Sequence, residues 1–207
     1  IEKDHRLIED LEKVFSPEIQ NGSFTLIHGD VLECYEKVTS LFNGYKIVAN
    51  IPYYISGALL RLSLESSAKP KTMVLMVQKE VAKRIVARDE KESILSLSVK
   101  AYGKPRYVDT VKKEYFKPVP KVDSAIIAIE HISQNFFSDI KETLFFLLIK
   151  TSFNQKRKTL GATLKLLFKN HTQEIFADSG INPKSRPEDL SLEEWKILVQ
   201  SMQKFEI

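Results

Sequence analysis

Apolar runs of strand length alternate with amphipathic stretches through the first 130 residues of the chain. Thr72–Val77 is an apolar run of the kind expected for a strand that is covered on both faces. Lys46–Ala49 and Ser124–Glu130 predict two further strands, and Gly57–Leu64 and Gln78–Ala87 predict helices. Strands that alternate with helices in this way predict an α/β sheet flanked by helices.

The start of the chain also predicts regular elements. Leu7, Leu11 and Val14 recur at helical spacing after Asp4, which is a favoured N-cap residue. Phe24–Ile27 predicts a short strand. The remaining predictions for this part of the chain are an N-cap at Ser56, a helix over Ser93–Ala101 and a strand over Arg106–Lys112.

The pattern changes near residue 135, and the rest of the chain predicts helices only. From Ile140 onward the apolar positions have helical spacing. Ser191 followed by Glu194 matches a capping box, which predicts the start of a last helix. We therefore predict two domains, one over residues 1–135 and a small helical one over 136–207.

Composition narrows the class of protein. The 207 residues are 43% hydrophobic and 28% charged, which is typical of a globular protein in water and excludes a disordered one. The single cysteine, Cys34, excludes an internal disulfide and fits a reducing compartment, so we expect a cytoplasmic protein. The most apolar run, Leu144–Ile149, is too short to span a bilayer. No His, Cys, Asp or Glu cluster has metal-ligand spacing, so we predict no metal.

The stretch Asn50-Ile51-Pro52-Tyr53 directly follows the predicted strand Lys46–Ala49. Pro52 fixes its own φ and keeps Ile51 out of the helical region, so a stiff loop follows the strand. The carboxyl ends of strands are where open α/β sheets bind ligands. Asn50 offers a donor and an acceptor, and Tyr53 offers a flat aromatic face. The stretch predicts a loop that holds a planar base with an exocyclic amino group, and a simple turn is the alternative.

Two acidic residues near the start of the chain have two interpretations each. Glu2 can accept hydrogen bonds from both ribose hydroxyls of a nucleotide, although a solvated residue near a chain end is the favoured interpretation of this position alone. Asp30 follows Gly29, which permits a close approach of backbone to a ligand, and its carboxylate can accept from an adenine amino group. A turn or helix-capping role for Asp30 is equally expected.

Phe116 and a set of cations complete the candidate chemistry. Phe116 lies beside Pro-rich turns and is the aromatic residue that we expect to pair with Tyr53, because a flipped base is held by stacking. A place in the core is the alternative. The net charge is only +4, but Lys150–Asn170 contains six Lys or Arg and no Asp or Glu. This predicts a helix pair that binds phosphates. The cations that extend this surface are Lys79, Lys83, Arg84 and Arg88.

Four stretches resemble one enzyme family. Asn50-Ile-Pro-Tyr53 resembles the catalytic [Asn/Asp]-Pro-Pro-Tyr motif of adenine amino-methyltransferases that use S-adenosylmethionine, and Ile1-Glu-Lys-Asp4 resembles their acidic motif. Phe116-Lys-Pro-Val-Pro-Lys-Val-Asp-Ser124 resembles the late motif of the KsgA-type ribosomal RNA adenine dimethyltransferases. Ser152-Phe-Asn-Gln-Lys-Arg-Lys-Thr-Leu160 resembles their helical-domain signature. The resemblance covers essentially the whole chain.

The resemblance implies a fold and an activity. The fold is a Rossmann-like class I methyltransferase core, incomplete at the N-terminus, followed by a small all-helical C-terminal domain. The activity is N6,N6-dimethylation of two adjacent adenosines in 16S ribosomal RNA, with S-adenosylmethionine as methyl donor. The enzyme is expected to be a monomer that acts on the small ribosomal subunit or its precursor.

The resemblance also implies which residues act. The catalytic residues are Asn50, Ile51, Pro52, Tyr53 and Phe116. The cofactor-binding residues are Glu2, Asp30, Val31 and Asn50. The RNA-binding residues are Lys150, Asn154, Lys156, Arg157, Lys158 and Lys165.

Two departures from the family's pattern matter. The Gly-rich cofactor loop that precedes the acidic motif in the family has no counterpart here. We therefore expect residues upstream of Ile1 in the functional protein, and weak or no cofactor binding by these residues alone. Tyr54 stands where bacterial members often have Asn, which leaves its role open.

Other functions share some of these features. A resistance-type methyltransferase of 23S ribosomal RNA and a DNA adenine methyltransferase share the Asn-x-Pro-Tyr chemistry, but the stretch from Phe153 to Lys158 argues against both. A non-catalytic RNA-binding assembly factor is the alternative from a different class, and the absent cofactor loop motivates it. Calorimetric measurement of cofactor binding distinguishes this alternative from an enzyme.

Overall fold

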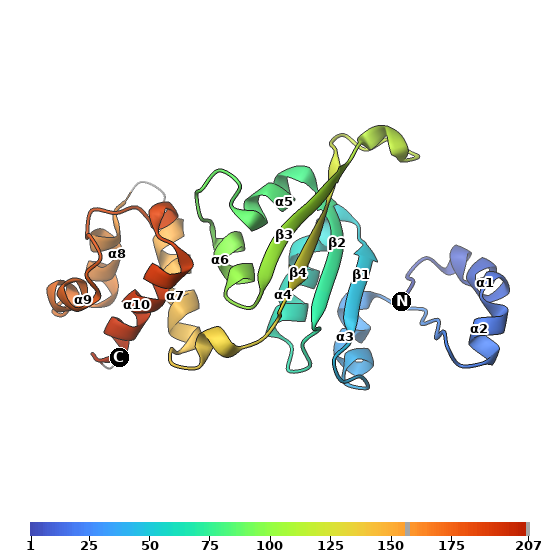
Figure 1. The fold of residues 1–207 in the computed structure, drawn as a ribbon, viewed down its shortest axis with the longest axis horizontal. Coiled ribbons are helices and arrows are strands. Elements are labelled where there is room, and N and C mark those ends of the chain that lie inside the picture. The colour runs from blue at the N-terminus through green and yellow to red at the C-terminus, as the bar shows by residue number, and fades with distance from the viewer. Residues whose placement is uncertain (156–157, 206–207) are drawn as a thin grey trace. The chain divides into compact units, whose positions relative to one another are not determined.

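The computed structural model describes residues 1–155 and 158–205 (Figure 1). The contacts within the chain form two compact units. The first unit comprises residues 1–45 and 54–70, and the second comprises residues 46–53 and 71–207. The predicted division into domains 1–135 and 136–207 stays a prediction. No helix of the described residues combines the length and the apolar character needed to cross a bilayer.

The second unit is built on a sheet of four strands in the order β1-β2-β4-β3 (Figure 1). β1 pairs in parallel with β2, and β4 pairs antiparallel with both β2 and β3. The strands predicted over Lys46–Ala49, Thr72–Val77, Arg106–Lys112 and Ser124–Glu130 are therefore present, and the sheet is mixed rather than wholly parallel. Their bounds are Lys46–Asn50 for β1, Thr72–Gln78 for β2, Lys104–Val111 for β3 and Ser124–Glu130 for β4.

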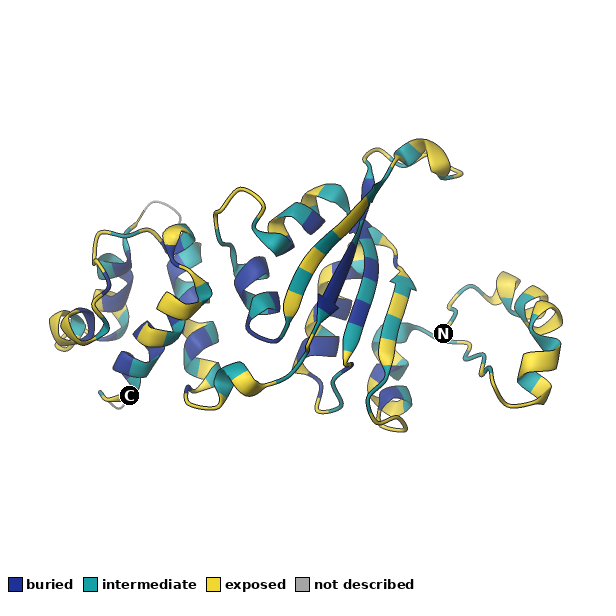
Figure 2. Ribbon diagram, in the orientation of Figure 1, coloured by how far each residue is buried: buried dark blue, intermediate teal, exposed yellow. Residues whose placement is uncertain are grey.

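The two central strands hold the core of the sheet. On β2, Met73, Leu75 and Val77 are fully buried and alternate with half-buried residues, as the two-residue period of a strand requires. Most of β4 is buried, in keeping with its central position. β1 forms one edge of the sheet in the described part of the chain, and Val48 on it is 79% exposed. One face of β1 is therefore open (Figure 2).

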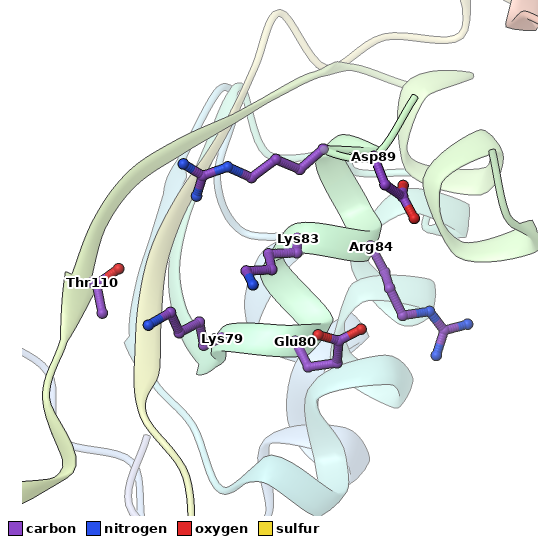
Figure 3. A pocket seen from close by; sticks show the side chains of 7 residues that line it. Lys79, Glu80, Lys83, Arg84, Asp89 and Thr110 are labelled. Atoms are coloured by element: carbon purple, nitrogen blue, oxygen red, sulfur yellow. The ribbon is translucent and has the colours of Figure 1, made fainter. Parts of the chain in front are cut away.

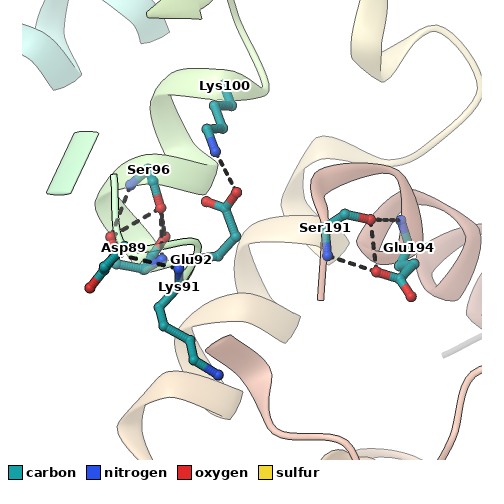
Figure 4. Close-up of polar contacts among 8 residues, drawn as sticks. Asp89, Lys91, Glu92, Ser96, Lys100, Ser191 and Glu194 are labelled. Atoms are coloured by element: carbon teal, nitrogen blue, oxygen red, sulfur yellow. Dashed lines mark hydrogen bonds and ion pairs between the residues drawn. The ribbon is translucent and has the colours of Figure 1, made fainter. Parts of the chain in front are cut away.

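Two helices pack against β3. α5 (Lys79–Val86) follows β2 directly and ends at Ala87, whose φ of 51° terminates the helix in the left-handed region. The N-cap of α6 (Ile94–Lys100) is Ser93, which forms a capping box with Ser96. Figure 4 shows this cap beside the ion pair between Glu92 and Lys100. The Glu92 N–H also donates to the Glu188 carbonyl at 2.9 Å, which ties the loop between α5 and α6 to the helical end of the chain.

The chain after β4 is helical, as predicted. One apolar core runs from α6 into these helices, with Phe145 and Trp195 fully buried in it. The predicted capping box is confirmed, because Ser191 and Glu194 bond each other's backbone N–H groups (Figure 4). The elements are η3 (Asn135–Phe137), α7 (Glu142–Asn154), α8 (Leu160–Leu167), α9 (Thr172–Ser179), η4 (Pro187–Asp189) and α10 (Leu192–Gln203).

The first unit contains four helices: α1 (His5–Val14), α2 (Ser16–Gln20), α3 (Val31–Thr39) and α4 (Ser56–Glu65). The predicted cap of α1 is confirmed, because the Asp4 side chain accepts from a backbone N–H of the first turn. The apolar positions of α1 are not covered by the described residues, since no residue of this helix is buried. Amphipathic spacing therefore predicted the helix correctly without specifying a contact for its apolar face.

Two predictions for this unit are wrong. Phe24–Ile27 is not a strand, because Glu2 and His28 form only an isolated parallel bridge. A strand ladder requires several consecutive residue pairs, whereas Glu2 and His28 form a single pair. Ser56 is not an N-cap, because Ile55 takes that position and Ser56 is the first helical residue, with a buried hydroxyl.

Candidate active site

The loop Asn50–Tyr53 lies at the carboxyl end of the parallel strand pair. Asn50 is the last residue of β1 and is aligned with Met76 of β2. Ile51 is buried, whereas Asn50 and Pro52 are exposed. The buried Ile51 anchors the loop, and the amide of Asn50 stays accessible to a ligand. Tyr53 begins the short helix η1 (Tyr53–Ile55).

A hydrogen bond between two distant parts of the chain fixes Tyr53. Its phenol oxygen lies 2.8 Å from Oγ of Ser124, and either group can be the donor. Ser124 is the first residue of β4 and is 1% exposed. This bond therefore attaches the tyrosine to one of the two central strands of the sheet.

Phe116 lies at the same cavity as the Asn50 loop. It follows the short helix η2 (Lys113–Tyr115), is half-buried, and donates its backbone N–H to the Lys113 carbonyl at 3.2 Å. The cavity has a volume of about 320 Å³. The structure thus brings all five predicted catalytic residues together. The residues that line the cavity are Asn50, Ile51, Pro52, Tyr53, Phe116, Lys117, Pro118, Pro120 and Ser124.

The lining of this cavity limits its chemistry. It offers an amide, a phenol, a buried hydroxyl and two aromatic rings, and the described lining residues include no carboxylate and no histidine. A proton-transfer mechanism with a side-chain carboxylate or imidazole therefore lacks its group here. The arrangement suits a planar aromatic ligand that is held by stacking and by hydrogen bonds at one edge.

The predicted cofactor residues Glu2, Asp30 and Val31 belong to the first unit, whereas Asn50 belongs to the second. Glu2 lies beside the segment that leads to Asp30, because its N–H donates to the Ile27 carbonyl and its carbonyl accepts from the Gly29 N–H, both at 2.9 Å. The Oε1 atom of Glu2 accepts from the Asp4 N–H at 2.7 Å. Its Oε2 atom has no hydrogen-bond partner among the described residues, so one carboxylate oxygen is available to a ligand.

Asp30 has a visible structural role. It is the N-cap of α3, because its Oδ1 accepts from the Leu32 N–H at 2.9 Å, and its Oδ2 pairs with Nζ of Lys3 at 2.6 Å. The hydrogen bond from the Lys3 ammonium is the largest cause that holds the pKa of Asp30 below its usual value, and the bond from the Leu32 N–H is the next largest. Val31, the next residue, begins α3. The capping interpretation is therefore confirmed, and ligand contacts of Asp30 and Val31 stay predictions.

A cationic groove lies between α5 and β3. Its cavity has a volume of about 630 Å³. In Figure 3, the side chains of Lys79 and Lys83 extend from α5 toward Thr110, whereas Arg84 points the other way. A neighbouring cavity of about 410 Å³ shares Lys79 and Lys83 and adds Lys113 and Lys121. The first cavity is lined by Lys79, Glu80, Lys83, Arg84, Arg88, Asp89 and Thr110.

The predicted RNA-binding residues lie on and between α7 and α8. Lys150 and Asn154 of α7, Lys158, and Lys165 of α8 are all exposed. None of the ion pairs between described residues involves the three lysines, so no carboxylate there neutralises their charges, although Nζ of Lys150 lies 5.7 Å from the centroid of the Phe146 ring. The predictions for Lys156 and Arg157 lie outside the described residues.

A family model matches almost the whole chain. The model for "Ribosomal RNA adenine dimethylase" matches residues 1–204. The chain belongs to this family.

Within the described ranges, no group of three or more His, Cys, Asp or Glu is arranged to hold a metal ion.

Curated members of the dimethylase family match most of the chain. "Ribosomal RNA small subunit methyltransferase A" of Dehalococcoides mccartyi is 41% identical over 202 residues, which cover 96% of this chain and 68% of the relative. The protein of the same name from Fusobacterium nucleatum is 36% identical and covers 97% of this chain and 76% of the relative. The predicted family is therefore confirmed.

Solved structures confirm the fold. A dimethyladenosine transferase from Plasmodium falciparum aligns with a TM-score of 0.77 at 24% identity, covering 99% of this chain and 81% of that one. The 23S rRNA methyltransferase ErmE aligns with a TM-score of 0.73 at 20% identity, covering 98% and 80%. The prediction of a methyltransferase-type α/β fold with a helical end is therefore correct.

Two contacts at or beside the candidate site were not predicted from the sequence. The Tyr53–Ser124 bond joins residues 71 positions apart, and the ion pair between Lys79 and Asp123 joins residues 44 apart. The only available signal was that Asp123 and Ser124 end the late family motif. That motif gives no indication of their partners.

Proposed function

We propose that the protein transfers methyl groups from S-adenosylmethionine to N6 of two adjacent adenosines in small-subunit ribosomal RNA, twice on each base. The observation that carries the proposal is the cavity in which the Asn50 loop and Phe116 meet. The family and the relatives' names support the same chemistry. We further propose that the enzyme acts as a monomer in the cytoplasm, on the small subunit or its precursor.

Asn50 has the central chemical role. The amino nitrogen of adenine is a poor nucleophile because its lone pair is delocalised into the ring. The Asn50 side-chain oxygen accepts one N–H of this amino group, and a loop carbonyl near Ile51 accepts the other. Both bonds favour a localised lone pair and direct it out of the ring plane. The nitrogen becomes acidic once it is methylated and its proton leaves to water, so catalysis comes from positioning and electrostatics rather than from a general base.

The two aromatic side chains hold the base. An RNA base must leave its stack before its amino group is accessible, and flipped bases are held by stacking between aromatic or apolar side chains. Tyr53 and Phe116 provide these surfaces, and Pro52 keeps the loop stiff. Dimethylation requires the monomethylated base to bind again. The cavity of about 320 Å³ is open to solvent at Asn50, which leaves room for the first methyl.

The residues of the first unit fit a nucleoside. When bound, S-adenosylmethionine supplies the electrophilic methyl group. The Oε2 atom of Glu2 is available to accept from ribose hydroxyls, and Asp30 can accept from an amino group in exchange for its bond to Lys3. Val31, the first residue of α3, follows Asp30 directly and is proposed to contact the same nucleoside. Asn50, which belongs to the second unit, is proposed to contact both the methyl donor and the adenine base.

We assign RNA binding to exposed lysines and one exposed amide. Lys150, Asn154, Lys158 and Lys165 bind phosphates and shape rather than sequence, as expected for folded RNA. The groove of α5, with Lys79 and the cations near it, continues this contact on the catalytic unit. We include Lys156 and Arg157 from the sequence motif alone.

The test uses labelled S-adenosylmethionine, small ribosomal subunits that lack the modification, and the full-length protein. The native protein is expected to label the small-subunit RNA, and Asn50→Ala is expected to reduce the rate by at least about 100-fold because the amino group loses its acceptor. Asn43→Ala, which changes an exposed loop amide, is the matched control. Full activity of the Asn50 variant contradicts the mechanism, and label on large-subunit RNA contradicts the substrate.

A further inference from the structure

Asp123 connects three parts of the second unit. Its Oδ2 pairs with Nζ of Lys79 at 3.1 Å, and its Oδ1 accepts from the backbone N–H of Lys113 at 3.2 Å. Its own carbonyl accepts from the Lys79 N–H at 3.0 Å. The start of α5, the start of η2 and the start of β4 therefore meet at one residue.

One of these contacts leads directly to Phe116. Lys113 begins η2, and its carbonyl accepts from the Phe116 N–H at 3.2 Å. The bond from Lys113 to Asp123 closes the loop of which Phe116 is a part, at the point where this loop returns to the sheet. The position of the Phe116 ring thus depends on a carboxylate that does not line its cavity.

Ser124 acts on the other aromatic ring. It is almost fully buried at the start of β4, and its hydroxyl bonds the phenol of Tyr53. Two adjacent residues where the chain enters β4 therefore reach the two rings, Asp123 through the loop and Ser124 through the phenol. The two rings line the same cavity.

We infer that Asp123 and Ser124 are positioning residues that hold Phe116 and Tyr53 at the spacing required to stack one adenine. The inference rests on the proposed function for its substrate. It adds two residues that act through the rings: Asp123 does not line the cavity, and the Ser124 hydroxyl, which does, is bonded to the Tyr53 phenol. A role in stability alone fits less well, because the Lys79 and Asp123 side chains are 37% and 31% exposed. Ion pairs with this exposure contribute little to folding.

The first experiment removes the carboxylate. In the full-length protein, Asp123→Ala is expected to lower kcat by about 10- to 100-fold, because a small displacement of a stacking ring misplaces the reacting nitrogen. The KM for small subunits is expected to stay within about twofold, since the phosphate contacts proposed at α7 and α8 are unchanged. Asp123→Asn keeps an acceptor for the Lys113 N–H, so its kcat is expected to fall less than that of Asp123→Ala. Asp109→Asn, an exposed carboxylate on β3, is the control. An unchanged kcat for Asp123→Ala overturns the inference.

The second experiment tests Ser124 by a double-mutant cycle. Ser124→Ala and Tyr53→Phe remove the same hydrogen bond from its two sides, so each is expected to lower kcat by about 2- to 10-fold. The double variant is expected to match the single variants, because the bond is already absent. Losses that multiply in the double variant contradict the assignment of Ser124 to Tyr53.

A third readout is independent of catalysis. In protein labelled with ¹³C at phenylalanine, Asp123→Ala is expected to shift the ring resonances of Phe116 and to leave those of Phe145, in the helical core, unchanged. Unchanged Phe116 resonances overturn the inference whatever the activity. Absence of methyl transfer by the native protein contradicts the proposed function instead, so the two failures are distinguishable.

Discussion

The carboxylate of Asp30 serves the fold of the first unit and is also a candidate ligand group. Its two oxygens bond Lys3 and the start of α3 in the structure. An adenine amino group is a donor, as the Lys3 ammonium is, so it can replace Lys3 without leaving a carboxylate oxygen unpaired. The helix cap through the other oxygen is retained. The two interpretations of this residue are therefore compatible.

The pKa of Asp30 gives a prediction with a defined sign. Since its folded-state pKa lies below its unfolded-state value, its stabilisation is present above the unfolded pKa and is lost as the pH falls through the folded pKa. Lys3→Met is expected to raise the pKa of Asp30 toward its usual value, because the largest cause of the shift is removed. The bond from Leu32 keeps part of the shift.

Titration of the Asp30 side-chain carbon by ¹³C NMR measures this change. Lys13→Met, which removes an exposed lysine of α1, is the control and is expected to leave the titration unchanged. An Asp30 titration that is the same in Lys3→Met and the native protein contradicts the observed pairing.

At this scale, the sequence predicted residue types better than their partners. Asn50, Tyr53 and Phe116 were predicted as a group because motif spacing marks them, and the structure places them at one cavity. The support of Tyr53 by Ser124 was not predicted, because a hydroxyl at the start of a strand carries no signal of a partner 71 residues away. Local chemistry is readable from sequence, whereas contacts that depend on chain topology are not.

Among the elements, the turn between α6 and β3 depends on a glycine. A Cβ at Gly103 would lie 2.9 Å from Cγ2 of Ile129 and 3.0 Å from the Glu130 carbonyl oxygen. The carbonyl belongs to the backbone of the central strand β4 and has little freedom to move. Gly103→Ala is therefore expected to destabilise the protein by about 1–3 kcal/mol, as overpacking does.

Urea unfolding of this variant tests the close approach. The matched control is Gly57→Ala in α4, where a Cβ has no atom within 4 Å. That substitution is expected to stabilise by about 0.5–1 kcal/mol, because alanine loses less backbone freedom than glycine in a helix. If both variants are equally stable, Gly103 is not constrained by β4.

Ser191 provides a second test at the element scale. Its hydroxyl accepts from the Glu194 N–H at the start of α10, a helix that carries the buried Trp195. Ser191→Ala is expected to cost about 1 kcal/mol, the usual value of an N-cap. Ser133→Ala, which alters an N–H contact before η3 and no α-helix cap, is the comparison. A midpoint in urea unchanged by Ser191→Ala contradicts the capping role.

Caps and apolar periodicity predicted most of the elements. Asp4 and Ser191 cap helices as expected, because an N-cap requires only a side chain and the next three residues. The order of the strands, with β4 between β2 and β3, was not predicted, because pairing is decided by contacts far apart in sequence. The same limit explains the wrong prediction of a strand over Phe24–Ile27, which forms no ladder and is followed by a single bridge between His28 and Glu2.

At the scale of the whole molecule, the proposed RNA contact rests on lysines that form no ion pair within the described residues. Lys150, Lys158 and Lys165 are exposed and are absent from the ion pairs of the described residues. Each Lys→Met variant is expected to weaken binding to small-subunit RNA and to reduce the slope of log K against log salt by about one, because one phosphate contact is lost.

The salt dependence is measured by filter binding or fluorescence anisotropy at several salt concentrations. Lys204→Met is the control, because this lysine already pairs with Asp178 at 2.6 Å and is expected to change the slope less. Equal slopes for the native protein and all three variants contradict an RNA contact at α7 and α8.

The central claim is that the protein dimethylates adenosine, and the most direct measurement identifies the modified nucleoside. Unmodified small subunits are incubated with the full-length protein and S-adenosylmethionine, and their RNA is digested and analysed by mass spectrometry. The account predicts N6,N6-dimethyladenosine at two adjacent positions with the native protein and its loss with Asn50→Ala. Monomethyladenosine alone, a different modified base, or dimethyladenosine that persists in the Asn50 variant would contradict it.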